Sequence, residues 1–284
     1  MSLSVLNNIA ALYAQNNLAS TQKNLQNTLT QLSSGSRINS GADDAAGLAL
    51  ADGLHANVAA LNQSARNASD GIGLLQTADG ALSQVTNLLN RAVTLATQAA
   101  NGTLNNSQVS AANQEYQNIL SEIGNIGSST NFNGNAVFSS SATTIFVSDG
   151  TSSGATVFSD TTGALSTAKV GLDAAGTSVD FTATGVATLT ASTAQTVLTN
   201  LTTAIAGVAY QRGQIGANIN QLNAASSVAT SQSENLTSAE SSIRSTDYAT
   251  ATSELAKFQV LSQTGISALA QANQTQQQVL KLLQ

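Results

Sequence analysis

Two acidic residues and an arginine lie close together near position 40, and they could form a catalytic cluster. Asp43 and Asp44 follow Arg37 in a stretch of polar and small residues. The two acids also stand directly before Ala45 and Ala46, where a helical pattern begins. Acids at that place accept hydrogen bonds from free backbone N–H groups and oppose the positive end of the helix. We therefore interpret Asp43 and Asp44 as an N-cap and a first-turn acid, and Arg37 as the partner in one ion pair.

Other reactive residue types are too few for a catalytic or metal site. His55 is the only histidine and cysteine is absent. This excludes a His-based triad with a second histidine, a multi-histidine zinc site, a thiolate site and a disulfide framework. Gly71, Gly73 and Gly80 lack the spacing and the following Lys-Ser/Thr of a phosphate-binding loop. The sequence predicts no enzyme, no cofactor and no metal.

Charge is scarce along the whole chain. Of 284 residues only 8% are charged, and nine basic residues leave a net charge of −6, which argues against nucleic-acid binding. No apolar run approaches the roughly 18 residues that span a bilayer. The first basic residue is Lys23, so we expect no ordinary secretory signal peptide at the N-terminus.

Apolar residues at helical spacing predict five long helices. Their expected ranges are 3–33, 45–100, 105–128, 193–236 and 247–283. The first and last are similar in length and nearly uncharged, which favours pairing of the two ends in a coiled coil. Gly71, Gly73 and Gly80 fall inside the second helix, and each costs about 1 kcal/mol there against alanine. We attribute these three glycines to close packing.

A different texture in the middle of the chain predicts a small β region. Residues 144–147 and 155–158 are short β-prone runs separated by a Gly- and Ser-rich loop, which is typical of a hairpin. Residues 179–183 form a third β-prone run, and 131–134 (Asn-Phe-Asn-Gly) is a turn signal. The predicted fold class is mainly α: a long helical hairpin or coiled-coil bundle with a small β-hairpin region in the middle.

Several long motifs in this order resemble bacterial flagellin. They are residues 32–49 (LSSGSRINSGADDAAGLA), 61–63 (LNQ) with 66–72 (RNASDGI), 76–82 (QTADGAL), 131–134 (NFNG), 268–274 (ALAQANQ) and 279–283 (VLKLL). The resemblance covers about 1–150 and 195–284, hence most of the chain. The stretch 159–190 is too short for large outer domains, so the chain is similar to a minimal form of flagellin.

The resemblance implies a division into domains. Residues 1–44 with 243–284 would form the terminal coiled-coil inner core, and 45–190 with 191–242 a helical bundle with a β-hairpin at about 131–185. Gly35, Arg37, Asn39, Asp43 and Asp44 would form the junction, or spoke, between the domains. Ten residues would pack in the inner core: Leu18, Leu25, Leu29, Leu32, Leu255, Phe258, Leu261, Leu269, Val279 and Leu282.

The resemblance also implies partners and a place. The chain would polymerise with copies of itself outside the cell, after export in unfolded form by the flagellar type III system without a cleaved signal peptide. Its partners would be an export chaperone, the filament cap and hook-associated proteins. Arg91, Leu95 and Glu115 occupy the positions of a patch that is a subunit contact or a site for the innate immune receptor of flagellin.

Three functions are compared on these grounds. The first is the subunit of the flagellar filament, formed by head-to-tail contacts that do not close. The second is a hook–filament junction protein with flagellin-like ends. The third, an enzyme on the same scaffold, is disfavoured because metal and triad constellations are missing. We also expect the termini to be disordered in the free chain and to fold on assembly, since their apolar stripes need neighbours.

Overall fold

The computed structural model describes residues 8–139, 142–149, 151, 156–160, 162–163, 165–172, 178–180 and 188–282. Over this part of the chain, the helices are α1 (Ile9–Ser34), α2 (Ala45–Ala100), α3 (Asn106–Ser129), α4 (Ala194–Arg244) and α5 (Tyr248–Leu282). The strands are β1 (Asn131–Phe132), β2 (Asn135–Ala136), β3 (Thr143–Val147), β4 (Thr156–Asp160), β5 (Lys169–Leu172) and β6 (Ser178–Asp180). The mainly helical fold class with a small β region is confirmed.

The chain divides into two compact units. The first contains Met1–Ala56 and Asn235–Gln284, and the second contains Asn57–Glu234. Because α2 and α4 are long, each contributes residues to both units. The first unit therefore contains α1, α5, the start of α2 and the end of α4.

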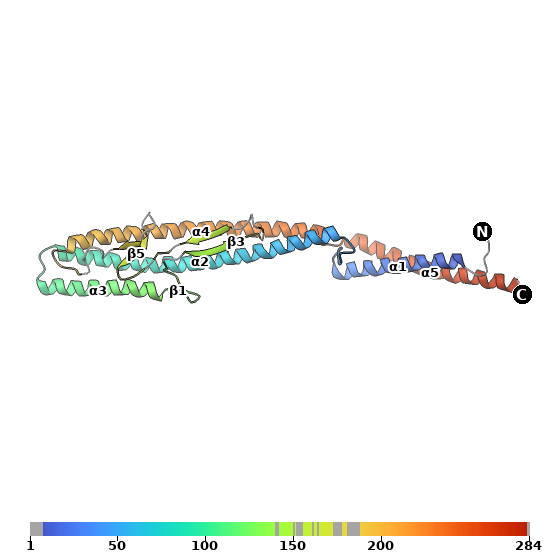
Figure 1. Ribbon diagram of the computed structural model, residues 1–284, viewed down its shortest axis with the longest axis horizontal. Helices are drawn as coiled ribbons and strands as arrows, with labels where there is room; N and C mark the ends of the chain where they lie inside the picture. Colours follow the sequence, from blue (N-terminus) through green and yellow to red (C-terminus); the bar gives the residue numbers. More distant parts are fainter. Residues whose placement is uncertain are drawn as a thin grey trace. The chain divides into compact units, whose positions relative to one another are not determined.

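In the first unit, α1 and α5 lie side by side and antiparallel (Figure 1). Near one end of the pair, Asn8 Nδ2 donates to the carbonyl of Ala272 at 3.1 Å. Further along, Gly265 lies so close to Leu18 that a Cβ on the glycine would be 3.2 Å from Leu18 Cδ1. The helices thus make close contact where one side chain is only a hydrogen atom.

The core of the second unit is built by α2, α3 and α4. Its fully buried large side chains come from all three helices: Leu75, Leu82, Leu89, Tyr116, Ile123, Leu201, Ile215 and Leu222. Burial of each leucine contributes roughly 1.5–3 kcal/mol. An ion pair between Arg212 of α4 and Asp79 of α2, at 2.7 Å, adds a polar link outside this core.

A capping box starts α3. The side chain of Asn105 accepts from the backbone of Gln108, whose side chain accepts from the backbone of Asn105. This reciprocal arrangement satisfies two backbone N–H groups that the first helical turn leaves free.

Each of the three strand pairs is antiparallel and contains two strands. The β1–β2 pair turns at Asn133 and Gly134, whose φ angles of 50° and 81° are the two positive values that a type I′ hairpin needs. In β3, Ile145 and Val147 are buried while Thr144 and Phe146 are exposed. This alternation gives the strand one face toward the core.

Polar side chains of α2 hold β3 in place. Ser64 Oγ donates to the carbonyl of Ser148 at 2.7 Å and accepts from the Ser148 N–H at 2.8 Å. Asn67 Nδ2 donates to the carbonyl of Phe146 at 3.0 Å. Four residues after Asn67 on the same helix, a Cβ on Gly71 would overlap the side chain of Ile145 in β3. The glycine therefore lets the hairpin approach the helix.

Several expectations about elements need correction. The fourth helix continues to Arg244 instead of ending near Leu236. Its last turns carry the pair Glu240–Arg244 at 3.7 Å, and Arg244 also lies 3.6 Å from Asp52 of α2. The strand β5 was not predicted, since its segment is short and contains a glycine. Gly80 is exposed with open space around its Cβ position, so packing within the chain does not explain it.

Parts of the predicted ranges lie outside the described residues, namely 3–7 of the first helix, Ala155 of the hairpin, 181–183 of the third β run and Leu283 of the last helix. In the part of the chain that the structure describes, no helix combines the length and apolar character that crossing a membrane requires.

Candidate assembly interface

One stripe of α1 is partly shielded from solvent. The buried and half-buried residues of this helix from position 11 on are Ala11, Ala14, Leu18, Thr21, Leu25, Thr28, Gln31 and Leu32. The steps between most of them alternate between three and four residues, which is the seam of a two-helix coiled coil.

The partner stripe on α5 has the same spacing. Its buried and half-buried residues are Ala251, Leu255, Phe258, Ser262, Gly265, Leu269 and Ala272. On both helices many seam positions carry alanine, glycine, serine or threonine, which bury little apolar surface. Since a helix pair is stabilised by the apolar area that it buries, this seam is a weak one.

Large apolar side chains of the same two helices point away from the seam. Among the described side chains, eight of them are exposed: Ile9, Leu12, Tyr13, Leu29, Tyr248, Val260, Leu261 and Ile266. Val260 has 64% and Ile266 50% of its surface exposed. Such a density of exposed apolar side chains on one weakly charged helix pair is typical of an interaction surface.

The structure separates the predicted inner-core residues into two groups. Leu18, Leu25, Leu32, Leu255, Phe258 and Leu269 lie in the seam, whereas Leu29 and Leu261 are exposed. The side chains of Val279 and Leu282 lie outside the described part of the chain. Sequence periodicity alone does not make this separation, because both kinds of leucine recur at helical spacing.

The two chain segments that leave the α1–α5 pair are held together by a short β-bridge. Ser36 pairs with Ser245 in antiparallel fashion. The Arg37 N–H donates to the carbonyl of Arg244 at 2.7 Å, and the Thr246 N–H donates to the carbonyl of Gly35 at 3.1 Å. Residues from opposite ends of the chain therefore share a backbone ladder, which we call the junction bridge.

Gly35 ends α1 in the left-handed conformation, with φ at 70°. A Cβ at this position would lie 2.8 Å from the hydroxyl oxygen of Tyr248 at the start of α5. The left-handed backbone conformation favours glycine here, and a Cβ would also force the end of the Tyr248 side chain to shift.

Arg37 does not form the predicted ion pair. Its guanidinium donates instead to the carbonyl of Ile243 at 2.8 Å, and its own carbonyl accepts from the Gln31 side chain at 3.0 Å. The carboxylates of Asp43 and Asp44 are engaged elsewhere. The arginine thus binds the end of α4 through hydrogen bonds to the main chain.

Asp44, predicted as a first-turn acid, is instead the N-cap of α2 and accepts from the Gly47 N–H at 2.9 Å. Asp43, predicted as the N-cap, lies one residue before it. It accepts from the N–H groups of Asn39 and Ser40 at 3.2 and 2.9 Å and from the Ser40 hydroxyl at 3.0 Å. The Ser40 hydroxyl first, and then these amides, lower the pKa of Asp43. Both acids therefore shape the backbone around the start of α2.

Asn39 completes the loop by donating from its side chain to the carbonyl of Ser36 at 2.7 Å. Ile38, which the sequence reasoning passed over, is 2% exposed and anchors the loop in the first unit. The signal for Ile38 was present, because it is the one large apolar residue among small and polar neighbours.

Of the three residues predicted to form a patch on the second unit, only Arg91 and Glu115 have side chains at the surface. Arg91 Nε donates to Glu115 Oε1 at 2.6 Å, and this bond raises the pKa of Arg91 and lowers the pKa of Glu115. Leu95 is 2% exposed and belongs to the core. A partner that met this surface would contact Arg91 and Glu115 but not Leu95, since the leucine side chain is buried in the core.

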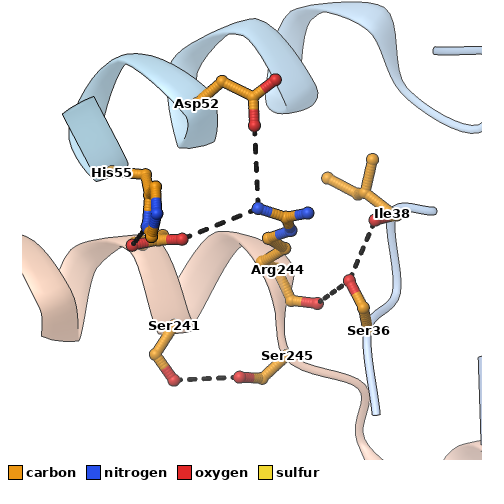
Figure 2. Close-up of polar contacts among 8 residues, drawn as sticks. Ser36, Ile38, Asp52, His55, Ser241, Arg244 and Ser245 are labelled. Carbon is orange, nitrogen blue, oxygen red and sulfur yellow. Dashed lines mark hydrogen bonds and ion pairs between the residues drawn. The ribbon is translucent and has the colours of Figure 1, made fainter. Parts of the chain in front are cut away.

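A charged network at the junction was not predicted. Arg244 forms ion pairs with Asp52 of α2 and with Glu240, and Glu240 also contacts His55. Figure 2 shows the Arg244 side chain pointing toward Asp52, with His55 nearby on the same helix as Asp52. Glu240 and Arg244 are four residues apart, and this spacing on a helix predicts an ion pair between them. The contacts with Asp52 and His55 of α2 cannot be predicted from the sequence, because they depend on how the two helices pack.

Among the described residues, no group of three or more His, Cys, Asp or Glu side chains is placed to hold a metal ion. What the first unit offers is therefore an apolar surface, a hydrogen-bonded junction and a charged network.

Comparisons with known proteins agree with this architecture. The family described as "Bacterial flagellin N-terminal helical region" matches residues 5–143, and "Bacterial flagellin C-terminal helical region" matches 198–283. A flagellin of Halalkalibacterium halodurans is 36% identical over 277 residues, which are 97% of this chain and 98% of that protein.

Two further proteins are similar. The flagellar filament 30.7 kDa core protein of Treponema maltophilum is 32% identical over 97% of this chain and 98% of its own length. The crystal structure of Bacillus cereus flagellin, at 32% identity, superposes with a TM-score of 0.46 over 62% of this chain and 94% of that one. On the matches to both family regions and to a full-length relative, the chain belongs to the bacterial flagellin family.

Proposed function

We propose that this chain is the repeating subunit of a bacterial flagellar filament and that it polymerises through the apolar residues exposed on α1 and α5. Membership of the flagellin family supports the filament role. The observation that carries the proposed interface is the set of large apolar side chains that the α1–α5 seam leaves in solvent.

The energetics favour burial of this surface by other copies. Burying a valine or leucine side chain contributes roughly 1.5–3 kcal/mol. Few charged residues interrupt α1 and α5: Lys23 on the first, and Glu254, Lys257 and Lys281 on the second. Little charge must be desolvated when neighbours cover these helices, so apolar burial decides the balance.

The proposed domain roles follow from this interface. The paired ends would form the inner core, in which the exposed residues of one copy meet the neighbouring copies, and the helical bundle would form the next shell. The junction residues, Gly35 to Asp44, would connect the two. A filament component of this kind lies outside the cell.

Export and the remaining partners rest on the family. The chain would pass the flagellar type III apparatus unfolded and without a cleaved signal peptide. A chaperone would hold the C-terminal helix before export, and cap and hook-associated proteins would meet the growing end. Arg91 and Glu115 would serve as a subunit contact or as contacts for the innate immune receptor. Function as a structural protein leaves no enzymatic role for the chain.

A polymerisation assay tests the interface. Purified chain is seeded with sheared filament ends, and free subunit is measured by sedimentation. We expect Val260→Thr to raise the subunit concentration at equilibrium about tenfold, because a hydroxyl replaces a methyl group on a side chain of nearly equal size that neighbours would bury.

Gln259→Thr is the matched control, since Gln259 is exposed on the same helix and receives the same residue. Its polymerisation should stay close to that of the unmodified chain. Equal effects of both substitutions would refute the interface, because helix propensity would then explain them. Short rings in place of long filaments would instead favour a hook–filament junction protein.

A further inference from the structure

The chain contains two asparagine–glycine pairs, Asn101–Gly102 and Asn133–Gly134. In such a pair the backbone nitrogen of the glycine can attack the side-chain amide of the asparagine, because glycine has no side chain to hinder the approach. Both asparagines are exposed to solvent. The two pairs are therefore equal in sequence and in exposure, and only their backbones distinguish them.

Asn133 and Gly134 form the tight turn between β1 and β2. Their φ angles of 50° and 81°, together with the pairing of Phe132 and Asn135, are those of a type I′ hairpin. In this turn the glycine nitrogen lies nearly opposite to the asparagine Cβ, viewed along the Cα–C bond of the asparagine. Attack on the side chain requires these two atoms to be eclipsed. The reaction at Asn133 therefore has to break the turn.

Asn101 and Gly102 lie in the loop between α2 and α3. The Asn101 N–H donates to the carbonyl of Gln98 at 3.2 Å, whereas the Gly102 N–H has no hydrogen-bond partner among the described residues. Gly102 is exposed, and a Cβ on it would meet open space. A rotation that brings the Gly102 nitrogen to the Asn101 side chain therefore breaks no hydrogen bond of that nitrogen.

The Asn101 side chain is directed toward the residues that follow it. Its Nδ2 donates to Thr103 Oγ1 at 3.1 Å, so the side chain reaches past the neighbouring glycine to the residue beyond. A reaction within one molecule is fastest where the reacting groups are already near each other and free to align. Asn101 meets this condition and Asn133 does not.

We propose that Asn101 is a site of spontaneous covalent modification, namely deamidation through a cyclic imide, and that folding protects Asn133 from the same reaction. The Gly102 nitrogen loses its proton to water and forms a bond to Asn101 Cγ. The bond between Cγ and Nδ2 then breaks, and Nδ2 takes up a proton from water and leaves as ammonia. A water molecule finally opens the ring at either of its two carbonyl carbons, which gives aspartate or isoaspartate.

The product has a carboxylate that the sequence does not encode. The carboxylate follows the C-terminal end of α2, where the helix dipole disfavours a negative charge. In the isoaspartate form the main chain is also one carbon longer, four residues before Asn105, which caps α3. The modification therefore acts on the connection between two helices of the second unit. The inference concerns the single chain and does not depend on polymerisation.

Incubation of the folded full-length chain in neutral buffer tests the proposal. Peptide mapping by mass spectrometry measures the converted fraction at both asparagines, and isoaspartate identifies the cyclic route. In the folded chain, conversion at Asn101 should be about tenfold faster than at Asn133, because a misplaced attacking atom slows a reaction by factors of this size. In the urea-unfolded chain the two rates should become similar.

The variants Asn101→Gln and Asn133→Gln are a matched pair, because attack on a glutamine side chain must close a larger ring. Ammonia release from the folded chain should fall strongly in Asn101→Gln and stay nearly unchanged in Asn133→Gln. Circular dichroism establishes that each variant is folded before the comparison is made.

Four results would overturn the proposal. They are similar rates at both sites in the folded chain, conversion at Asn101 that is much slower in the folded than in the unfolded chain, a difference between the sites that persists after unfolding, and aspartate at position 101 without isoaspartate. None of these results bears on whether the chain polymerises, which the seeded assay measures separately.

Discussion

Asp43 and Asp44 are neighbours in sequence, yet the structure gives them different tasks. Asp44 caps α2 by accepting from the Gly47 N–H, while Asp43 closes the turn before the helix. We expect Asp44→Ala to lower the free energy of unfolding by about 1 kcal/mol, because one N–H of the first helical turn loses its partner. Asp44→Ser should restore most of this loss.

Thermal or urea unfolding of the free chain, followed by circular dichroism, measures both variants. The reading of Asp44 as a cap would be wrong if the alanine and serine variants were equally unstable. The contribution would then come from the charge of Asp44 and not from its acceptor oxygen.

Glycines inside the helices fall into two classes that a substitution distinguishes. A Cβ on Gly127 of α3 would overlap the main chain of Leu165, whereas a Cβ on Gly80 of α2 would meet open space. We expect Gly127→Ala to destabilise the chain by about 1–3 kcal/mol through overpacking. Gly80→Ala should stabilise it by about 1 kcal/mol through helix propensity.

The same unfolding experiment compares the two alanine variants. Because the substitution is identical and both sites are helical, each serves as the control for the other. A stabilised Gly127→Ala would show that the segment around Leu165 moves aside without cost, contrary to the packing described above.

At the scale of elements, the sequence predicted the helices well and their pairing surfaces less well. The range 45–100 coincides with α2, because a helical apolar stripe runs its whole length and acids and Asn-Gly mark its ends. The extension of α4 to Arg244 was missed, because its last turns contain few large apolar residues. Their ion pairs with Asp52 and His55 of α2 are contacts that periodicity does not reveal.

Pairing surfaces depend on which stripe meets which neighbour. Leu25 and Leu29 lie on the same helix, yet Leu25 is in the seam and Leu29 is 48% exposed. A heptad count that started from the small residues Ala11, Ala14, Thr21 and Thr28 would have found the seam. Large apolar residues, which usually mark a helix-pairing surface, do not identify this seam, because some of them lie in the seam and others on the exposed surface.

At the scale of the whole molecule, the weak seam predicts different behaviour of the free and assembled chain. In the free chain, we expect the apolar area that α1 and α5 bury to fall short of offsetting the entropy of ordering them. Brief digestion by a protease of broad specificity should remove both ends first and leave the second unit. In seeded filaments the ends should be resistant, because neighbouring copies cover them.

Mass spectrometry of the fragments identifies the resistant segment. Digestion of the free chain that spared both ends would argue that α1 and α5 are stable without neighbours. Filaments whose ends are cut as fast as those of the free chain would place the assembly contacts elsewhere.

The antiparallel pairing of α1 with α5 also fixes the order of events when the chain emerges from a narrow opening. Asn8 hydrogen-bonds to Ala272, which follows it by 264 residues. If the N-terminus emerges first, α1 can therefore pair with α5 only after nearly the whole chain has emerged. Contacts between such distant residues form slowly, because a very long loop must close. The second unit can therefore fold while α1 is still unpaired. The first unit folds only when the C-terminal helix has also emerged.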